Sequence, residues 1–320
     1  MGSKTTSEGK FKSSLTTEIF NKVKGHSSLI KLAKSMPVKF AGTDIFTFSL
    51  DSEVSIVGEG GQKPAGNATI TPVNVKPIKV IYQHRVTDEF MKMAEEEALP
   101  ILENFSDGFA KKIASGFDIM GMHGVNPATL EASLAIGTNH LDNSSIAEVE
   151  LGTGYNPESA LTDAVALLGD YEATGYALSK AFAAKLGSLK ENGVSLYPEY
   201  KLGGNPGQLN GTPADVNSTV TKGNTDDLAF VGDFANAFRW GFAENVKYEV
   251  IEFGDPDGQG DLKRTNEIVI RAEAYIGWAI LDNSAFVRIV AEEEPEPGPD
   301  DDDNGGEGGG GDNGGEGVSP

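Results

Sequence analysis

The chain has 320 residues, no cysteine and a formal net charge of −22, from 26 basic and 48 acidic residues. The lack of cysteine excludes disulfides, thiolate metal sites and a thiol nucleophile. Apolar residues make up 38% of the sequence, enough for a packed core, whereas no apolar run approaches the roughly 20 residues of a membrane span. The start of the chain also lacks the apolar segment of a signal peptide, so the protein is expected to stay in the cell that makes it.

The first 50 residues are predicted to form an extended arm. Apolar residues of Leu15–Ala33 recur loosely at helical spacing, and Phe46, Phe48 and Leu50 alternate with polar residues, which predicts a short strand. The lysines of this arm are expected on a solvated or subunit-facing surface.

A long hairpin is predicted next. Val54–Val57 and Ile70–Ile81 are its expected strands, and the glycine-rich run VGEGGQKPAG between them is dense enough in helix breakers to form a flexible tip. A two-stranded hairpin is only marginally stable alone in water. We therefore expect another subunit to support it.

A long amphipathic helix is the best-patterned element. Asp88 is predicted to cap a helix over Glu89–Ala98, and Pro100 can begin a second helix. Gly121 and Gly124 are expected to end it, because helix C-termini favour residues that tolerate positive φ. Its apolar stripe, predicted to face the core, comprises Leu102, Phe105, Phe109, Ile113, Phe117 and Met120.

Shorter helices and strands alternate in the rest of the chain. Asn156 before Pro157 predicts a helix start, with Leu161, Val165, Leu168 and Tyr171 on one face, and a further helix is predicted over Ala181–Leu189. Lys247–Phe253 and Glu267–Ile276 are predicted strands around the acidic segment GDPDGQGDLKR. No repeated βαβ unit occurs, so the fold class is α+β and not a doubly wound sheet.

The sequence contains no recognisable catalytic, cofactor or metal motif. There is no phosphate loop, zinc-protease motif or nucleophile elbow. No two of His26, His84, His123 and His140 have the spacing of local metal ligands, and each is interpreted as a surface or packing residue. The segment from Asp255 to Asp261 partly imitates a calcium loop but has Asn266 at its twelfth position, so a charged turn is expected. We predict no catalytic residue, no cofactor and no metal.

The last 30 residues form an acidic, glycine-rich tail. They contain eleven acidic residues and ten glycines but no lysine or arginine. Such a tract cannot bury apolar area and is predicted to be disordered, as a spacer or, in the sharper alternative, as a docking peptide for a partner.

Several segments, taken together with their order along the chain, resemble the Hong Kong 97 type major capsid proteins of tailed bacteriophages. VGEGGQKP, a β stretch and VTDEFM before a long helix are similar to that family's extended loop and the entry to its spine helix. Gly193–Val220, with its turn at Gly211–Pro213, resembles the axial-domain stretch. Val231–Val250 and Asn266–Ile289, including Ala285–Phe286, resemble the closing strands.

The resemblance implies a capsid fold with an arm, an extended loop, a peripheral domain with a spine helix, and an axial domain. In this chain the implied division is an N-terminal arm at 1–50, the extended loop at 51–82, the peripheral domain with the spine helix at 83–154, the axial domain at 155–230, peripheral-domain strands at 231–276, a return to the axial domain at 277–290 and the tail at 291–320. Arg239, Trp240, Arg271 and Trp278 are expected to pack in the core or the peripheral domain.

The implied function is a major capsid protein whose copies assemble as hexamers and pentamers into the icosahedral head of a tailed phage, around double-stranded DNA. Assembly would take place in the host bacterial cytoplasm, with a scaffolding protein, a portal and a maturation protease as partners and no membrane. Because no basic stripe is present outside the short Lys4–Lys39 region, the DNA would be enclosed without sequence-specific binding. The segment before the hairpin is too short for a long cleaved extension, which implies a separate scaffold or a processed chain.

Contact between subunits is predicted at the hairpin tip, at Gly58, Glu59, Gly60, Gly61 and Lys63. Lys63 is the lysine at the tip, where some family members crosslink to an asparagine of a neighbour. Asn283 does not match the acceptor motif, so Lys63 is interpreted as an ion-pair residue. The alternatives are an encapsulin-like nanocompartment shell and a monomeric ligand-binding domain.

Overall fold

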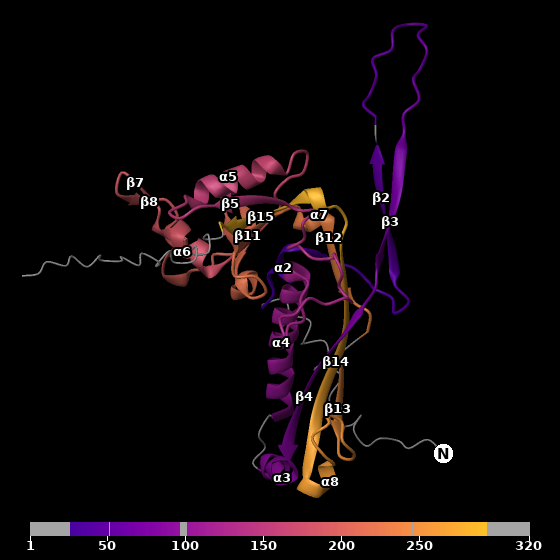
Figure 1. The fold of residues 1–320 in the computed structure, drawn as a ribbon, viewed down its shortest axis with the longest axis vertical. Coiled ribbons are helices and arrows are strands. Elements are labelled where there is room, and N and C mark those ends of the chain that lie inside the picture. Colours follow the sequence, from indigo (N-terminus) through magenta and orange to yellow (C-terminus); the bar gives the residue numbers. More distant parts are fainter. Residues whose placement is uncertain (1–25, 51, 97–100, 245, 293–320) are drawn as a thin grey trace, which may run out of the picture.

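The computed structural model describes residues 26–50, 52–96, 101–244 and 246–292. Predictions for the segment before residue 26, for Pro100, for the side chain of Leu102 and for the tail beyond residue 292 lie outside the described residues. Two sheets, each with its own helices, form the body, and a hairpin projects from it (Figure 1). Among the described residues, no helix combines the length and apolar character that crossing a membrane requires.

A five-stranded sheet runs along the length of the molecule, with β14 (Glu267–Ile280) at its centre. One edge of β14 pairs antiparallel with β4 (Ile78–Thr87). Along the other edge, the earlier residues of β14 pair with β13 (Lys247–Ile251), and its last residues pair with β12 (Phe238–Phe242), both antiparallel. The short strand β1 (Lys34–Ser35) adds to β12 in parallel. The sequence thus correctly predicted strands on both sides of the acidic loop.

The helix α4 (Ile101–His123) lies along this sheet, while α3 (Asp88–Glu96) and α8 (Leu262–Thr265) lie at its far end (Figure 1). The predicted apolar stripe faces the core from Phe105 to Met120. Phe117 is fully buried, and its ring contacts those of Phe238, Trp240 and Trp278. The burial of both tryptophans agrees with their predicted packing role.

Two helix boundaries differ from the sequence prediction. The α3 cap is Thr87, whose hydroxyl accepts a hydrogen bond from the Phe90 amide, and Asp88 is the first helical residue. Gly121 lies inside α4 and does not end it. Glycine is needed at this position because a Cβ there would lie 2.6 Å from the Leu29 side chain. Gly124, with φ of +68°, follows the helix end as predicted.

The second sheet has six strands, in the order β5, β15, β11, β6, β10, β9. The strands are β5 (Ala147–Leu151), β6 (Gly175–Leu178), β9 (Gln208–Leu209), β10 (Thr212–Val216), β11 (Asp227–Gly232) and β15 (Phe286–Ala291). Its helices are α5 (Pro157–Leu167) and α6 (Lys180–Ser188), which share a hydrophobic cluster with the sheet. As predicted, Asn156 caps α5, although Val165 is exposed and not part of the buried face.

Short elements complete the connections. They are α2 (Ser28–Leu32), the hairpin of β7 (Lys190–Glu191) and β8 (Val194–Ser195), α7 (Phe234–Ala237), and the 3-10 segments η2 (Pro198–Gly203), η3 (Ser218–Thr221) and η4 (Asn283–Ala285). Within the predicted helix Leu15–Ala33, the described residues are helical only in α2. Between its described strands the chain crosses from one sheet to the other three times: from β4 through α3 and α4 to β5, from β11 through α7 to β12, and from β14 through η4 to β15.

The projecting hairpin uses different strands from those predicted. It pairs β2 (Thr43–Leu50) with β3 (Ala68–Val75), so the strand predicted from Phe46, Phe48 and Leu50 is its first arm. The strand assignment of Val54–Val57 is wrong, because these residues lie in the open tip. The strand predicted over Ile70–Ile81 is interrupted at Lys76 and Pro77, because proline cannot donate a ladder hydrogen bond and restricts the residue before it.

Candidate subunit interface and buried polar centres

The predicted contact residues lie together at the exposed tip of the hairpin. Gly58, Glu59, Gly60, Gly61 and Lys63 are all exposed, and the tip closes with a hydrogen bond from the Gly61 amide to the Gly58 carbonyl at 3.0 Å. Gly60 has φ of +78°, a backbone conformation that glycine adopts at low cost. No described residue pairs with the Glu59 or Lys63 charge. The tip therefore presents both charges to whatever surrounds the molecule.

One face of the hairpin is apolar and exposed, which the sequence analysis did not identify. Phe48 lies directly across from Ile70, and Phe46 lies across from Pro72. Because side chains alternate along a strand, these four lie on the same face. Phe46, Phe48 and Ile70 are 67%, 62% and 61% exposed. We call these four residues the hairpin apolar face. Exposed apolar surface of this kind marks interaction sites.

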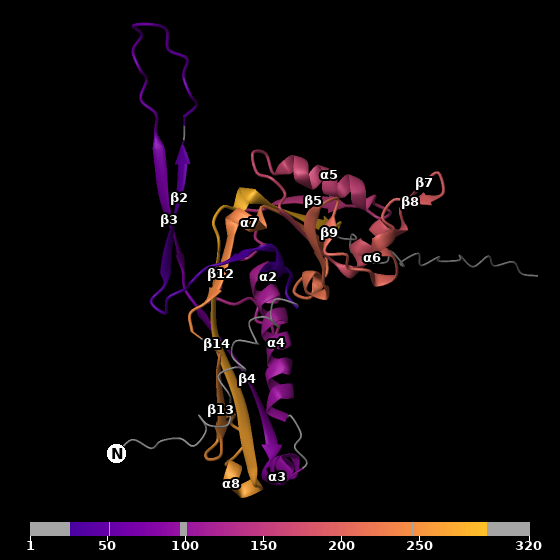
Figure 2. The ribbon, with the colours of Figure 1, turned by 180° about the vertical axis from the view of Figure 1, so that it is seen from behind.

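The base of the hairpin is fixed to the body. Val38 and Val75 form a buried cluster with Ala279 of β14. Figures 1 and 2 show the two strands extending well beyond this point, away from α3 and α8. The hairpin apolar face is thus held on a supported arm and has no cover from the described part of its own chain.

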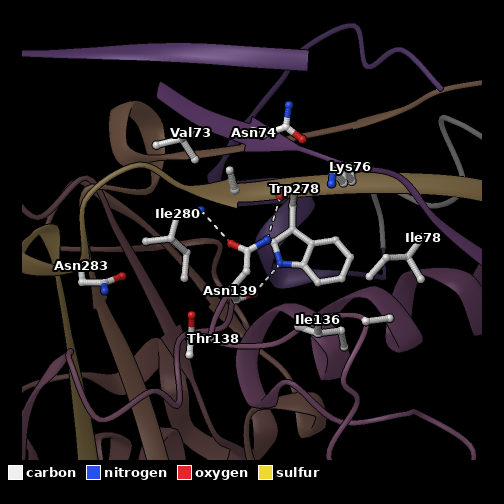
Figure 3. A pocket seen from close by; sticks show the side chains of 12 residues that line it. Val73, Asn74, Lys76, Ile78, Ile136, Thr138, Asn139, Trp278, Ile280 and Asn283 are labelled. Atoms are coloured by element: carbon white, nitrogen blue, oxygen red, sulfur yellow. Dashed lines mark hydrogen bonds between the residues drawn. The ribbon is translucent and has the colours of Figure 1, made fainter. Parts of the chain in front are cut away.

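A pocket lies beside this base (Figure 3). Trp278 lines it, and its indole Nε1 donates to the Asn139 carbonyl at 2.8 Å. The Asn139 side chain donates to the Trp278 carbonyl at 2.9 Å and accepts from the Ile280 amide at 3.1 Å. Asn283 also lines the pocket (Figure 3), whereas Lys63 lies in the hairpin tip. The pocket's polar groups mainly fasten a loop to β14.

A buried carboxylate anchors the start of the described chain. Asp118 of α4 accepts hydrogen bonds from the amides of Ser28 and Leu29 at the beginning of α2, and from the Ser27 and Thr219 hydroxyls. Burial raises the pKa of Asp118 to about 6, although these hydrogen bonds act in the opposite direction. Asp118 thereby joins α2, α4 and the turn η3.

An ion-pair cluster closes the far end of the long sheet. Arg85 of β4 contacts Asp257 and Glu267, and it donates to the Gly260 carbonyl at 2.7 Å. The hydrogen bond from Arg85 lowers the pKa of Asp257 to about 2. The acidic segment that partly imitates a calcium loop is thus a charged turn with a protein cation as its partner, as predicted. The Arg271 side chain reaches the same loop, donating to Gln83 and to the Pro256 carbonyl, and Arg239 donates to the carbonyls of Ala235 and Phe238.

A second buried cluster lies between the two sheets. His123 ends α4, and its imidazole lies near the carboxylates of Asp142 and Asp227. Burial disfavours the charged imidazole, but the two carboxylates outweigh it and raise the pKa of His123 to about 9. Arg288 of β15 contacts both carboxylates and Glu148. His123 is buried, and its acidic partners come from distant segments that local spacing could not reveal.

The match to known proteins covers nearly the whole fold. Residues 12–291 match the model of the phage capsid family. A solved structure from Mycobacterium phage Ogopogo is 32% identical, with a TM-score of 0.71, and the match covers 83% of this chain and 92% of that one. One from Gordonia phage Cozz is 25% identical, with a TM-score of 0.69, covering 84% of this chain and 87% of that one. No curated protein sequence gives a significant match.

A more distant structure has the same fold. The capsid of a native GTA particle is 16% identical with a TM-score of 0.55, and the match covers 82% of this chain and 89% of that chain. The family match and the fold together show that the chain belongs to the phage capsid family. It is a major capsid protein with an α+β fold like that of the Hong Kong 97 type, and it works as a structural subunit that assembles with copies of itself in the virion capsid.

Proposed function

We propose that copies of this chain form hexamers and pentamers, which tile an icosahedral head around the double-stranded DNA of a tailed phage. The observation that carries the proposal is the hairpin apolar face. It stands on an arm that the described part of the chain leaves uncovered, so a neighbouring copy is its natural cover. Head-to-tail contacts of this kind, between two different surfaces, close into rings.

Contacts at the tip would complete this interface. Glu59 and Lys63 are exposed beside Gly58, Gly60 and Gly61, and an ion pair to a neighbour would suit their opposite charges. An exposed ion pair is worth only about 0–1 kcal/mol. The apolar face therefore supplies most of the binding energy, and the tip charges help to set the register.

Further parts of the proposal rest on family membership. A scaffolding protein, a portal and a maturation protease are the proposed partners, with assembly in the host bacterial cytoplasm. The chain itself is proposed to have no enzymatic activity. The net charge of −22 favours confinement of DNA over binding, because phosphate contacts need clustered basic side chains.

The proposal is tested with a double variant, Phe48→Ser with Ile70→Ser, expressed with the neighbouring genes. Light scattering after size exclusion and electron microscopy should show shells for the wild type and unassembled, folded chains for the variant. The matched control, Thr47→Ser with Thr71→Ser, changes the adjacent cross-strand pair and should still assemble.

Two results would contradict the proposal. Normal shells from the double variant would remove the hairpin apolar face from the interface. A wild-type chain that stays a 34 kDa monomer, or particles that enclose protein cargo in place of DNA, would favour the ligand-binding domain or the nanocompartment.

A further inference from the structure

The buried cluster between the two sheets has the composition of a metal site. His123, Asp142 and Asp227 each offer one ligand atom, and these three atoms lie within 4.8 Å of one another. The side chains of His123 and Asp227 are completely buried. They come from the end of α4, the following loop and the first residue of β11, so the site exists only in the folded chain.

The protonation of His123 is restricted by its surroundings. Its Nε2 lies 3.0 Å from the Thr219 carbonyl oxygen. A carbonyl only accepts hydrogen bonds, so Nε2 carries a proton. Nδ1 carries a second proton in the charged ring and the lone pair in the neutral ring, so a metal cation would bind in place of that second proton. That lone pair points toward carboxylate oxygens, with Nδ1 at 3.1 Å from Asp227 Oδ2 and 3.9 Å from Asp142 Oδ2. Three electron-rich atoms thus converge.

Two of these atoms have no hydrogen-bond partner. His123 Nδ1 and Asp227 Oδ2 are both buried without a hydrogen bond. Buried polar atoms are nearly always satisfied, and each exception calls for a ligand, an ion or a strained contact. Here the two atoms face each other at 3.1 Å, so either a proton on Nδ1 or a single metal cation between them would satisfy both.

The groups around the cluster orient it as ligands are oriented in metal sites. Arg288 lies against the Oδ1 atoms of Asp142 and Asp227, which leaves both Oδ2 atoms facing the imidazole. Asn224 donates to Asp142 Oδ2 at 3.2 Å. Metal-bound histidines almost always donate their other ring N–H to a carbonyl or carboxylate, as His123 donates to Thr219. Arg288 and Thr219 are positioning residues in this arrangement.

We infer that His123 Nδ1 and the Oδ2 atoms of Asp142 and Asp227 bind a divalent transition-metal cation of the zinc class. One imidazole nitrogen and two carboxylate oxygens form a ligand set that suits zinc. The cation would connect the end of α4 in one half of the molecule to β11 in the other. It would stabilise the angle between the two sheets from inside a single subunit, independently of contacts between subunits.

The test uses the untagged, full-length protein, stripped with a chelator and then dialysed against Zn²⁺ or Co²⁺. We expect one Zn²⁺ per chain by mass spectrometry of the metal content, a rise in Tm on adding Zn²⁺, and visible absorption bands from ligated Co²⁺. Asp227→Asn should raise the Kd at least tenfold and abolish the Tm shift. The neighbouring Asp226→Asn is the matched control and should keep both.

Carboxylates are ligands for divalent ions, and the tail contains many of them, so the difference between the two variants, and not total uptake, is the decisive measurement. If Asp227→Asn does not fold, the wild-type protein tests the inference by itself: one Zn²⁺ per chain and the absorption bands of ligated Co²⁺ would support the site. A wild-type chain that takes up neither ion beyond the level of weak surface binding would overturn the inference and leave a proton as the occupant between His123 and the carboxylates.

Discussion

At the scale of single residues, the buried Asp118 of α4 holds the start of the described chain through hydrogen bonds from residues 27–29. Asp118→Asn replaces a carboxylate oxygen with an amide group that faces donors, leaving buried donors without an acceptor. We expect it to lower the free energy of unfolding by about 3 kcal/mol. Urea unfolding measures this, with the exposed Asp163→Asn as control. A loss no larger than that of the control would show that Asp118 does not anchor α2.

The same residue predicts a pH dependence. Burial raises the pKa of Asp118 to about 6, above the unfolded value of about 4. Between these pH values the folded chain holds a proton that the unfolded chain has released, so this group's contribution to stability grows as pH falls from 6 to 4. The stability difference between wild type and Asp118→Asn should therefore be larger at pH 5 than at pH 7. An equal difference at both pH values would refute the shift.

Residue patterns alone could not reveal either buried polar centre. The spacing of the histidines gives no sign of a cluster at His123, because its partners Asp142 and Asp227 are brought close only by the connection of the two sheets. Asp118 lies on the same helix as the predicted apolar stripe and is hidden among ordinary helix residues. A buried carboxylate on an amphipathic helix gives no local signal, because its donors belong to other segments.

At the scale of elements, Gly241 permits strand β1 to approach β12. A Cβ on Gly241 would lie 1.9 Å from the Met36 carbonyl oxygen. Gly241→Ala should therefore displace this segment and destabilise the chain by about 2 kcal/mol. Gly108→Ala is the matched control in α4, where a Cβ meets nothing within 4 Å. It should stabilise by about 0.5–1 kcal/mol. Thermal unfolding showing the same sign for both would contradict the close-approach argument.

Arg85 connects β4 to the charged turn between β13 and β14. Arg85→Met removes the partner of Asp257 and Glu267, so we expect the turn to open and become sensitive to limited proteolysis near Gly258. Lys79→Met on the same strand removes a more exposed ion pair, with Glu273, and should leave the turn protected. Equal cleavage in both variants would assign the protection of the turn to backbone pairing instead.

Elements with strong local signals are predicted from the sequence, whereas the pairing of the projecting hairpin is not. The stripe of α4 and the Asn156 cap of α5 are properties of one segment, so the sequence predicted them. The hairpin strands depend on which segments pair across the glycine-rich tip. Val54–Val57 has β-forming residues, yet the ladder ends at Leu50 and Ala68. The exposed apolar face could be recognised only once the register of Phe48 and Ile70 was known.

At the scale of the whole molecule, substitution of Lys63 tests whether this residue joins subunits by an ion pair or by a covalent bond. If it forms an exposed ion pair, Lys63→Ala should shift the denaturant midpoint of shell dissociation only slightly, with about 0–1 kcal/mol lost per contact. Lys190→Ala, an exposed lysine on β7, is the control. Wild-type shells should run as single subunits on a denaturing gel. A ladder of multimers that disappears in Lys63→Ala would show crosslinking instead.

The connection of the hairpin to the long sheet has a mechanical consequence. A pull on the tip along β3 passes through Lys76 and Pro77 into β4, which pairs with β14 over ten positions from Ile78 to Thr87. Because ladder hydrogen bonds lie perpendicular to the strands, tension along β4 loads many of them in shear at the same time. Outward pressure from a packed interior would therefore be carried by an element that resists sliding, with no single bond bearing the whole load.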